Sequence, residues 1–215
     1  MPRLPSSLVL GSRSPQRLLL LKQLFPKANV EVVPPLSAEE TGFAGLHDWN
    51  TIQSRLQQIT CDKSDDVIAQ LMQRNDIVAR QATVICADTT IIGIQESAAL
   101  QVLGKPPEDA TWKETVRGWF QQFYFGKTHF AATAVCIDTP EGERYECTTR
   151  TEIRFDSATE RWLEWYLETE ESRGKAGGYA IQGAGSIFLS EFNGSLSNII
   201  GLPQRELLQL LQSIT

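Results

Sequence analysis

Hydroxyl and cationic side chains gather directly after the first apolar segment of this chain. Apolar residues 8–10 run into G-S-R-S-P-Q-R at 11–17 and then into the leucine-rich residues 18–24. This pattern predicts a buried strand, a tight polar loop and a helix with Pro15 in its first turn. Helix N-termini offer unpaired N–H groups to anions, so the loop suits a phosphate. Alternatively, Ser14 only caps the helix and the two arginines are solvated.

Asp88 is the strongest single candidate for chemistry. It directly follows the apolar residues 82–87, which predict a buried strand that ends at the aspartate. Open α/β folds place ligand clefts at the ends of strands, and Thr89 and Thr90 beside it can donate hydrogen bonds. The alternative is that Asp88 only turns the chain, and the residues by themselves leave both interpretations open.

Lysine and glutamine side chains occur in two further segments with unusual backbones. Lys105 lies between glycine and proline on a stiffened turn, where it can clamp a phosphate. Lys175 and Gln182 belong to the glycine-rich residues 174–185, where missing side chains let backbone N–H groups approach a ligand closely. This stretch matches neither the P-loop pattern nor the dinucleotide-binding pattern. For each of these residues, ordinary surface solvation is the alternative.

Two acids, Glu39 and Glu40, follow a second predicted strand and offer the oxygen ligands that hard cations use with phosphate substrates. Most such acids only contribute to solubility. Together with the anion-binding loop, Asp88 and the lysines, however, they suit phosphate-bond chemistry. An aspartate with a divalent cation can activate water, while lysine and arginine neutralise charge on the phosphorus and the leaving group.

Composition narrows the class of protein. The chain has 215 residues, of which 41% are hydrophobic, enough for one domain spanning 1–215 with a sizeable core. Its 20 Lys and Arg against 26 Asp and Glu are scattered, which argues against a nucleic-acid partner. No stretch resembles a membrane span or a signal peptide, and the separated cysteines lack the spacing of a zinc site or a disulfide scaffold. We therefore expect a soluble, cytoplasmic protein with reduced thiols and no membrane partner.

Apolar periodicity predicts a single α/β unit with a mixed sheet, because no repeat or linker divides the chain. Strands are predicted at 8–10, 30–33, 82–87, 90–94, 130–137, 145–155 and 187–189. Helices are predicted at 15–24, at 52–74, from 107–109 onward, after a capping box at 157–160, and at 203–211. The two long segments at 130–137 and 145–155 are expected to pair as an antiparallel hairpin.

Six motifs, in order along nearly the whole chain, resemble those of the Maf family of nucleoside triphosphate pyrophosphatases. The segments in this chain are L-G-S-R-S-P-Q-R at 10–17, C-A-D-T at 86–89, L-G-K-P at 103–106, G-K-T-H with Thr133 at 126–133, K-A-G-G-Y-A-I-Q-G at 175–183, and N-G-S with G-L-P at 193–203. The corresponding family patterns are L-A-S-x-S-P-R-R, G-A-D-T, L-G-K-P, G-x-x-H-x-V-x-T, K-A-G-A-Y-x-I-Q-G, and N-G-S with G-L-P. No single motif is decisive, but six in the same order are very specific.

The resemblance implies a fold and a reaction. The fold would be α/β, with a mixed, strongly twisted central sheet flanked by helices and a cleft between two lobes, as in Maf and ITPase-like proteins. The reaction would be hydrolysis of a nucleoside triphosphate to the monophosphate and pyrophosphate, assisted by a divalent metal cation, Mg²⁺ or Mn²⁺. The resemblance also allows a homodimer.

The same resemblance implies roles for individual residues by matching position. Asp88 would accept a proton from the attacking water, or share that role with metal binding, alongside Glu39. The matched substrate-binding positions are Ser12, Arg13, Gln16, Arg17, Lys63, Thr89, Lys105, Lys175 and Gln182. Of these, Thr89 and Gln182 match positions linked to the choice of base. A-D-T with I-Q-G marks the branch that acts on dTTP and UTP rather than on 7-methyl-GTP.

Three departures from the family pattern bear on activity. Gln16 stands where the family has arginine, and glutamine cannot replace a bidentate guanidinium. Lys63 is matched only through C-D-K-S, a poor copy of A-x-x-K-A, and the metal-binding acid matches either Glu39 or Glu40. Two alternatives to the hydrolase therefore stay open: a nucleotide-binding regulatory protein that has lost turnover, and an unrelated phosphate-binding α/β protein whose motif order is chance.

Overall fold

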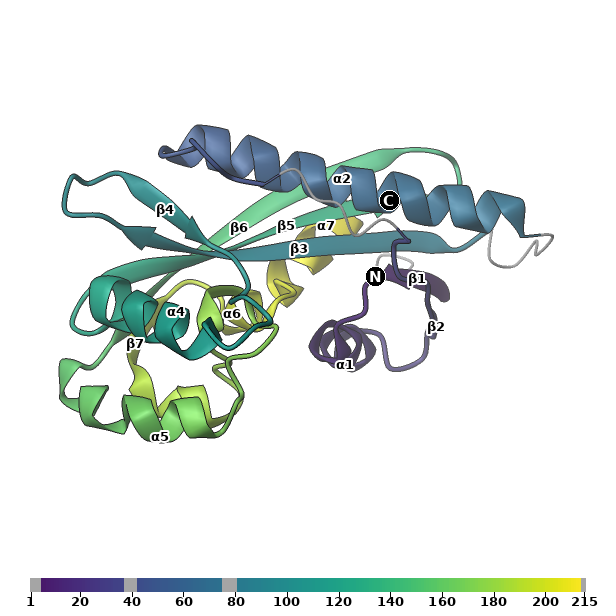
Figure 1. The fold of residues 1–215 in the computed structure, drawn as a ribbon. Helices are drawn as coiled ribbons and strands as arrows, with labels where there is room; N and C mark the ends of the chain where they lie inside the picture. Colours follow the sequence, from purple (N-terminus) through teal and green to yellow (C-terminus); the bar gives the residue numbers. More distant parts are fainter. Residues whose placement is uncertain (1–4, 37–41, 75–80, 214–215) are drawn as a thin grey trace.

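The computed structural model describes residues 5–36, 42–74 and 81–213. Its centre is a twisted seven-stranded sheet in the order β2-β1-β3-β5-β6-β7, with β4 paired to β3 (Figure 1). The strands are β1 (Ser7–Gly11), β2 (Asn29–Val32), β3 (Thr83–Ile94), β4 (Leu100–Leu103), β5 (Thr128–Asp138), β6 (Arg144–Phe155) and β7 (Leu189–Asn193). β1 is parallel to β2 and β3, whereas β5 is antiparallel to β3 and β6. The predicted mixed sheet and its long hairpin are thus confirmed.

Helices cover both faces of this sheet. They are α1 (Pro15–Leu24), α2 (Trp49–Gln73), α4 (Trp112–Trp119), α5 (Leu163–Glu168), α6 (Leu196–Ile200) and α7 (Gln204–Gln212). The long helix α2 crosses one face, whereas α1, α6 and α7 lie on the other (Figure 1). None of the helices in the described ranges is both long and apolar enough to cross a membrane.

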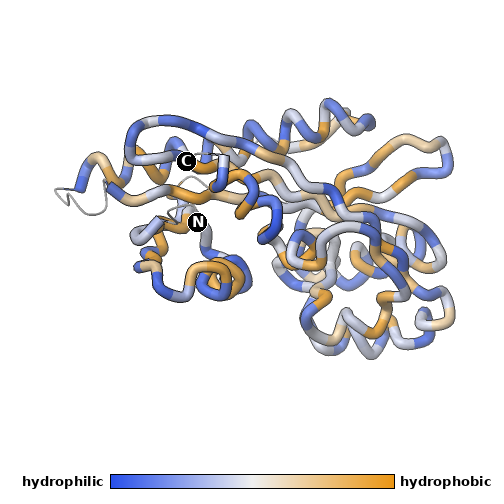
Figure 2. The backbone as a smooth tube through the Cα atoms, turned by 180° about the vertical axis from the view of Figure 1, so that it is seen from behind, coloured by the Kyte–Doolittle hydropathy of each residue, from blue (hydrophilic) through white to orange (hydrophobic). Residues whose placement is uncertain are grey.

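Away from α2, the chain forms two lobes. The α1 lobe consists of β1, α1 and β2, and its leucines pack with α7 over the inner strands. The α4 lobe consists of α4, α5, a π-helical turn (Phe120–Tyr124) and residues 174–188, which surround an aromatic core. Phe120 lies in the middle of that core, with its ring centroid 5.0 Å from those of Tyr124 and Phe188. Figure 2 shows hydrophobic segments running through the central strands and into both lobes.

Strand β3 has an uneven edge on the side of β1. β1 pairs with it only up to Gly11, opposite Cys86, and β4 pairs with it only from Ile91 onward. Residues 87–90 therefore pair with β5 on one side and with none of the described strands on the other. We call this open stretch of strand edge the β3 notch. The prediction that a strand ends at Asp88 is wrong, because β3 continues through Asp88 to Ile94. The β-branched residues that follow Asp88 favour an extended backbone. The strand that ends beside this point is β1.

Three predicted boundaries also differ from the structure. The helix expected to start at Pro-Glu-Asp begins later, because Asp109 accepts hydrogen bonds from the backbone and hydroxyl of Thr111 and forms a turn. The expected cap at Ser157 is supplied instead by Asp156, ahead of a short 3₁₀ helix. The strand expected at 187–189 is mostly 3₁₀ helix, and β7 begins only at the end of that range.

Gly11 and Cys86 share one side-chain space between β1 and β3. A Cβ atom on Gly11 would overlap the Sγ atom of Cys86, whose side chain is fully buried. The family patterns quoted above have alanine and glycine, respectively, at these two positions. The side-chain volume that the family pattern places on β1 therefore lies on β3 in this chain.

Gly11→Ala is accordingly expected to lower the free energy of unfolding by about 1–3 kcal/mol, the usual cost of overpacking a core. Cys86→Gly should also destabilise the protein, because it leaves a cavity. The double variant should be more stable than the sum of the two losses predicts, by about 1 kcal/mol or more, since the new methyl group fills the vacated space. Urea unfolding of the four proteins measures this coupling, and strictly additive losses would contradict the shared space.

Candidate active site

Two serine hydroxyls organise the loop between β1 and α1. Ser14 is the N-cap of α1, and its Oγ accepts a hydrogen bond from the backbone N–H of Arg17 at 3.4 Å. Ser12 is buried, and its Oγ accepts from the backbone N–H of Ser14 at 3.1 Å and from Nη1 of Arg17 at 3.2 Å. Ser14 therefore does cap the helix, and Ser12 is fixed directly beyond β1, beside the β3 notch.

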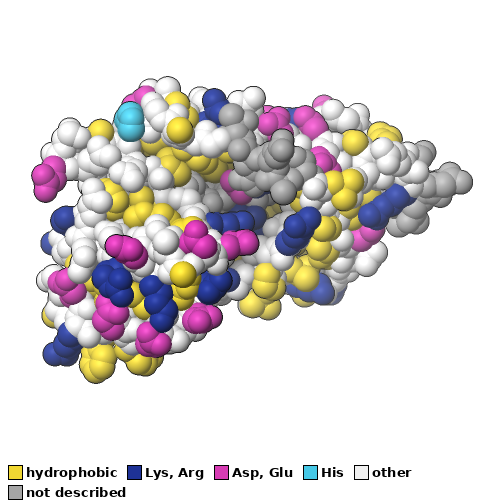
Figure 3. Space-filling model, viewed as in Figure 1, with side chains coloured by type: hydrophobic (Ala, Val, Ile, Leu, Met, Phe, Trp, Pro, Cys, Tyr) yellow, Lys and Arg dark blue, Asp and Glu magenta, His cyan; other side chains and the backbone are white. Residues whose placement is uncertain are grey.

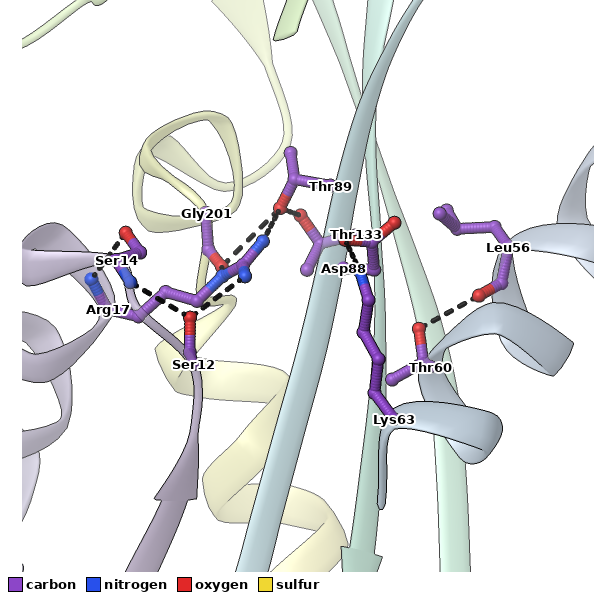
Figure 4. Close-up of polar contacts among 10 residues, drawn as sticks. All are labelled: Ser12, Ser14, Arg17, Leu56, Thr60, Lys63, Asp88, Thr89, Thr133 and Gly201. Atoms are coloured by element: carbon purple, nitrogen blue, oxygen red, sulfur yellow. Dashed lines mark hydrogen bonds and ion pairs between the residues drawn. The ribbon is translucent and has the colours of Figure 1, made fainter. Parts of the chain in front are cut away.

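Arg17 is tied into the interior contacts of the fold and is not a solvated surface charge. Its Nε donates to the carbonyl oxygen of Gly201 at 2.9 Å, and its Nη2 donates to Oγ1 of Thr89 at 3.0 Å (Figure 4). Oγ1 of Thr89 is in turn 2.9 Å from Oγ1 of Thr133 on β5. One guanidinium thus links the β1–α1 loop, the β3 notch and the C-cap of α6. Its planar fork of donors also suits phosphate oxygens.

Lys63 reaches Asp88 from the other side of the sheet. Its Nζ is 2.7 Å from Oδ1 of Asp88, and the two side chains are only 17% and 16% exposed (Figure 4). Successive side chains of a strand point to opposite faces, so Asp88 faces α2 while Thr89 faces α1 and α6. The β3 notch therefore has a cation on each face, Lys63 on one and Arg17 on the other.

A hydrogen bond between α2 and the end of β5 fixes the position of Lys63 along the sheet. The next residue, Ser64, donates from Oγ to Oδ2 of Asp138 at 2.6 Å, and Asp138 is the last residue of β5. Asp138 also accepts from Nε of Arg144 at 2.8 Å, and this hydrogen bond raises the pKa of Arg144. Sequence reasoning missed these contacts of Asp138. An aspartate directly after the largely apolar residues 130–137 was a signal for them.

The glycine-rich loop (174–185) lies against β3 just beyond the notch. A Cβ atom on Gly177 would come within 2.6 Å of the Ile91 side chain, so glycine is needed for this close approach. Gly177 also has a φ of 69°, and its N–H donates to the carbonyl oxygen of Gly104 at 2.9 Å. The turn that carries Lys105 is therefore joined both to the glycine-rich loop and, through it, to β3.

The predicted site residues fall into two groups. The structure brings together, around the β3 notch, Ser12, Arg17, Lys63, Asp88 and Thr89. Gln182 is exposed and Lys175 half-buried on the α4 lobe, and Lys105 is exposed on the turn after β4 that is joined to this lobe. Within the ranges that the structure describes, none of these three hydrogen-bonds to Asp88, so their part in the site stays a prediction.

The remaining predicted residues lie around the entrance of the β1–α1 loop. Oε1 of Gln16 accepts a hydrogen bond from Oγ of Ser14 at 3.2 Å, so the glutamine supports the cap where the family pattern has a cation. Arg13 is exposed, and its Nη2 donates to the carbonyl oxygen of Pro35 at 3.4 Å. Glu39 lies outside the described residues, as does the acid that follows it.

Buried polar side chains hold the glycine-rich loop from inside the α4 lobe. Oη of Tyr124 donates to the carbonyl oxygen of Gly177 at 2.8 Å, and Nε2 of His129 lies 3.1 Å from Oη of Tyr179. Burial raises the pKa of Tyr124 and lowers the pKa of His129 to about 3. The imidazole is therefore neutral in the folded protein near neutral pH.

This low pKa of His129 predicts sensitivity to acid. The unfolded chain takes up a proton near pH 6.5 and the folded protein only near pH 3, so stability is full above pH 6.5 and falls as the pH drops toward 3. The loss is about 1.4 kcal/mol per pH unit in that window. His129→Gln should make the decline between pH 6 and 4 shallower by that slope, as measured by urea unfolding. His47→Gln, at an exposed histidine, is the control, and equal slopes in all three proteins would contradict the assignment.

The donor set of the β3 notch fits a hard divalent cation that arrives with a polyphosphate. Within the described part of the chain, no three histidine, cysteine or acidic side chains gather as a metal group. Asp88 does place one carboxylate at the notch. Mg²⁺ needs only one or two protein carboxylates in such sites, because phosphate oxygens and water complete its octahedral shell. Asp88 is therefore the described residue that would hold the cation.

The molecular surface is hollowed between the α1 and α4 lobes. Figure 3 shows lysine and arginine side chains along the border of this hollow, with aspartate and glutamate side chains among them. Basic side chains thus border the hollow although the chain as a whole has a net charge of −6. The basic side chains at this hollow can attract an anionic ligand.

The chain is similar to known proteins along nearly its whole length. The family model described as Maf-like protein matches residues 7–214. The dTTP/UTP pyrophosphatase of Chelativorans sp. (strain BNC1) is 31% identical over 207 residues, which cover 96% of this chain and 90% of that protein. The dTTP/UTP pyrophosphatase of Brucella abortus (strain 2308) is 32% identical over 206 residues, which cover 95% of this chain and 89% of that protein. Among solved structures, a HAM1 protein from Coxiella burnetii aligns with a TM-score of 0.44 at 12% identity, over 70% of this chain and 73% of that one. The match of motifs, order and length shows that this chain belongs to the family of Maf-like proteins.

Proposed function

We propose that this protein hydrolyses nucleoside triphosphates to the monophosphate and pyrophosphate, with dTTP and UTP as preferred substrates. The observation that carries the proposal is the pairing of Asp88 with Lys63 in the β3 notch, on the face opposite to Arg17. The dTTP/UTP pyrophosphatases that resemble this chain support the reaction and the choice of substrates.

The side chains gathered around the notch have distinct roles in the proposed reaction. Asp88 accepts the proton of a water molecule whose oxygen attacks phosphorus, and the bond from phosphorus to the leaving pyrophosphate oxygen breaks with its electron pair. Lys63 orients the carboxylate and offsets charge that develops on the phosphate. Arg17 and Ser12 hold phosphate oxygens from the other face of the strand.

We infer that the reaction also uses a divalent cation, Mg²⁺ or Mn²⁺, held by Asp88 and by phosphate oxygens, with Glu39 as the second acid. When bound, such a cation offsets phosphate charge and makes a coordinated water more acidic. Lysine and arginine then neutralise the charge that the cation leaves uncompensated.

Selection of the base falls to the α4 lobe in this proposal. The hydroxyl of Thr89 is engaged by Arg17 and Thr133, so we infer that it orients the guanidinium. Gln182 is exposed on the glycine-rich loop, and its amide offers both a donor and an acceptor to the edge of a pyrimidine. Lys105 and Lys175 add positive charge on the same side.

A panel of nucleotides tests this function. The protein is incubated with dTTP, UTP, dCTP, dGTP and ATP with Mg²⁺ or Mn²⁺, or with a chelator, and pyrophosphate release is measured. The proposal expects the highest kcat/KM for dTTP and UTP and no release with the chelator. Release that persists with the chelator would contradict the role of the cation, and a preference for purines would contradict the assigned substrates.

Gln16 favours a second candidate function, nucleotide binding without turnover, because the loop lacks a guanidinium that the family pattern places there. Calorimetric titration with the same nucleotides separates the two functions. Affinity without pyrophosphate release would support the binding protein and contradict the hydrolase. Neither affinity nor release would contradict both.

A further inference from the structure

Glu171 joins the body of the α4 lobe to the segment that carries Gln182. Its Oε1 accepts a hydrogen bond from the backbone N–H of Ala184 at 3.1 Å, and its Oε2 accepts from the backbone N–H of Gly185 at 3.0 Å. Two bonds from one carboxylate to two consecutive N–H groups fix the direction of that backbone as well as its position.

Two glycines of this segment leave room for the contact with Glu171. Gly183 follows Gln182 directly, and a Cβ atom on it would overlap Oε1 of Glu171. A Cβ atom on Gly185 would come within 2.7 Å of the carbonyl oxygen of Ala180. The N–H of Gly183 also donates to that carbonyl oxygen at 3.2 Å, so the segment turns back on itself. The carboxylate of Glu171 therefore packs against a compact turn that has no room for side chains at Gly183 and Gly185.

Glu171 is itself held at the end of α5, beside the aromatic core. Its backbone N–H donates to Oγ1 of Thr169, just beyond α5, at 3.3 Å. Burial, and to a smaller extent the charge of Glu171, raises the pKa of the Tyr166 hydroxyl, so this carboxylate lies close to the aromatic core. The chain of contacts thus runs from the end of α5 through Glu171 to Ala184 and Gly185, shortly after Gln182.

We propose that Glu171 is a positioning residue for base selection. It acts through Gln182: the carboxylate clamp on the N–H groups of Ala184 and Gly185, two and three residues further along, holds the Gln182 amide in the orientation that meets the base. The inference rests on the proposed function and deepens it. Because the clamp holds the glycine-rich loop, it acts on which base is accepted more than on the chemistry at phosphorus.

Two substitutions disrupt the clamp by different means. Glu171→Gln keeps the shape but replaces one of the two acceptor oxygens with an amide nitrogen, which donates and cannot accept from an N–H group. Gly183→Ala keeps the charge but displaces the carboxylate sterically. In each, the ratio of kcat/KM for UTP to that for CTP should fall about tenfold, mainly through KM, as expected for a lost charge-assisted hydrogen bond. If both act on one clamp, the double variant should lose no more selectivity than either single variant.

Glu170→Gln is the matched control, because it removes the same charge from the preceding, exposed residue. Hydrogen exchange at the backbone of residues 180–188 gives a readout that is independent of turnover. The proposal expects faster exchange there in Glu171→Gln and wild-type exchange and selectivity in Glu170→Gln. Unchanged exchange in Glu171→Gln, unchanged selectivity with faster exchange, or fully additive losses in the double variant would each overturn it. If the wild-type protein shows no turnover, the proposed function fails instead, and exchange together with UTP and CTP affinities still decides the role of Glu171.

Discussion

Asp88→Asn is expected to lower kcat/KM for dTTP by a factor of about 10²–10⁴, the usual contribution of a positioned general base. Asparagine keeps the side-chain shape and can still accept the hydrogen bond from Lys63. It cannot take up the proton of the attacking water or bind a cation as a carboxylate does. Steady-state pyrophosphate release with Mg²⁺ measures the loss, and thermal unfolding shows that the variant keeps its fold.

Asp62→Asn is the control for this experiment. Asp62 is exposed on α2 next to Lys63, so the substitution makes the same change of charge close to the site without touching the β3 notch. It should keep the activity of the wild-type protein. Activity that survives in folded Asp88→Asn, or an equal loss in both variants, would show that the carboxylate of Asp88 is not the proton acceptor.

Arg17→Met is expected to cause the second largest effect, a loss of about 10²–10³ in kcat/KM, as found when one preorganised donor to a developing charge is removed. The substitution removes a cation from the phosphate side of the notch. It also removes the hydrogen bonds to Ser12, Thr89 and Gly201 that join three segments, so stability should fall as well. Kinetics and urea unfolding measure the two losses separately.

Arg17→Lys distinguishes charge from geometry at this position. Lysine keeps the charge but lacks the planar fork of donors, so it should recover only a small part of the activity. Lys22→Met, on an exposed part of α1, is the charge-matched control and should behave as wild type. Full recovery by lysine would contradict the geometric role of the guanidinium.

Local pattern predicted those parts of the site that local rules govern. The strand, loop and helix at the start of the chain follow from an apolar triplet, a serine cap and a proline in the first helical turn, and the structure confirms them. Asp88 also stood out by residue type alone. Its position at the end of a strand was predicted wrongly, because β3 continues through Asp88. The sequence shows where apolar residues stop, but it does not show which of two neighbouring strands ends.

Contacts between distant segments were beyond local reasoning. Arg17 donates to the carbonyl oxygen of Gly201, 184 positions along the chain, and nothing in either motif indicates the partner. Lys63 lies in a poor copy of its motif, yet α2 brings it to Asp88 because Ser64 is fixed by Asp138, 74 positions away. Such contacts depend on the path of the chain in space, which periodicity and motif spacing do not encode.

The reaction proposed for the β3 notch is cleavage of a nucleoside triphosphate to the monophosphate and pyrophosphate. Phosphorus NMR of a dTTP reaction with Mg²⁺ identifies the bond that breaks, because each phosphate product has its own resonance. We expect dTMP and pyrophosphate to appear in equal amounts, without dTDP or orthophosphate, and dTTP to stay intact in the same reaction with Asp88→Asn. Formation of dTDP and orthophosphate, or no change in the wild-type sample, would contradict the proposed cleavage.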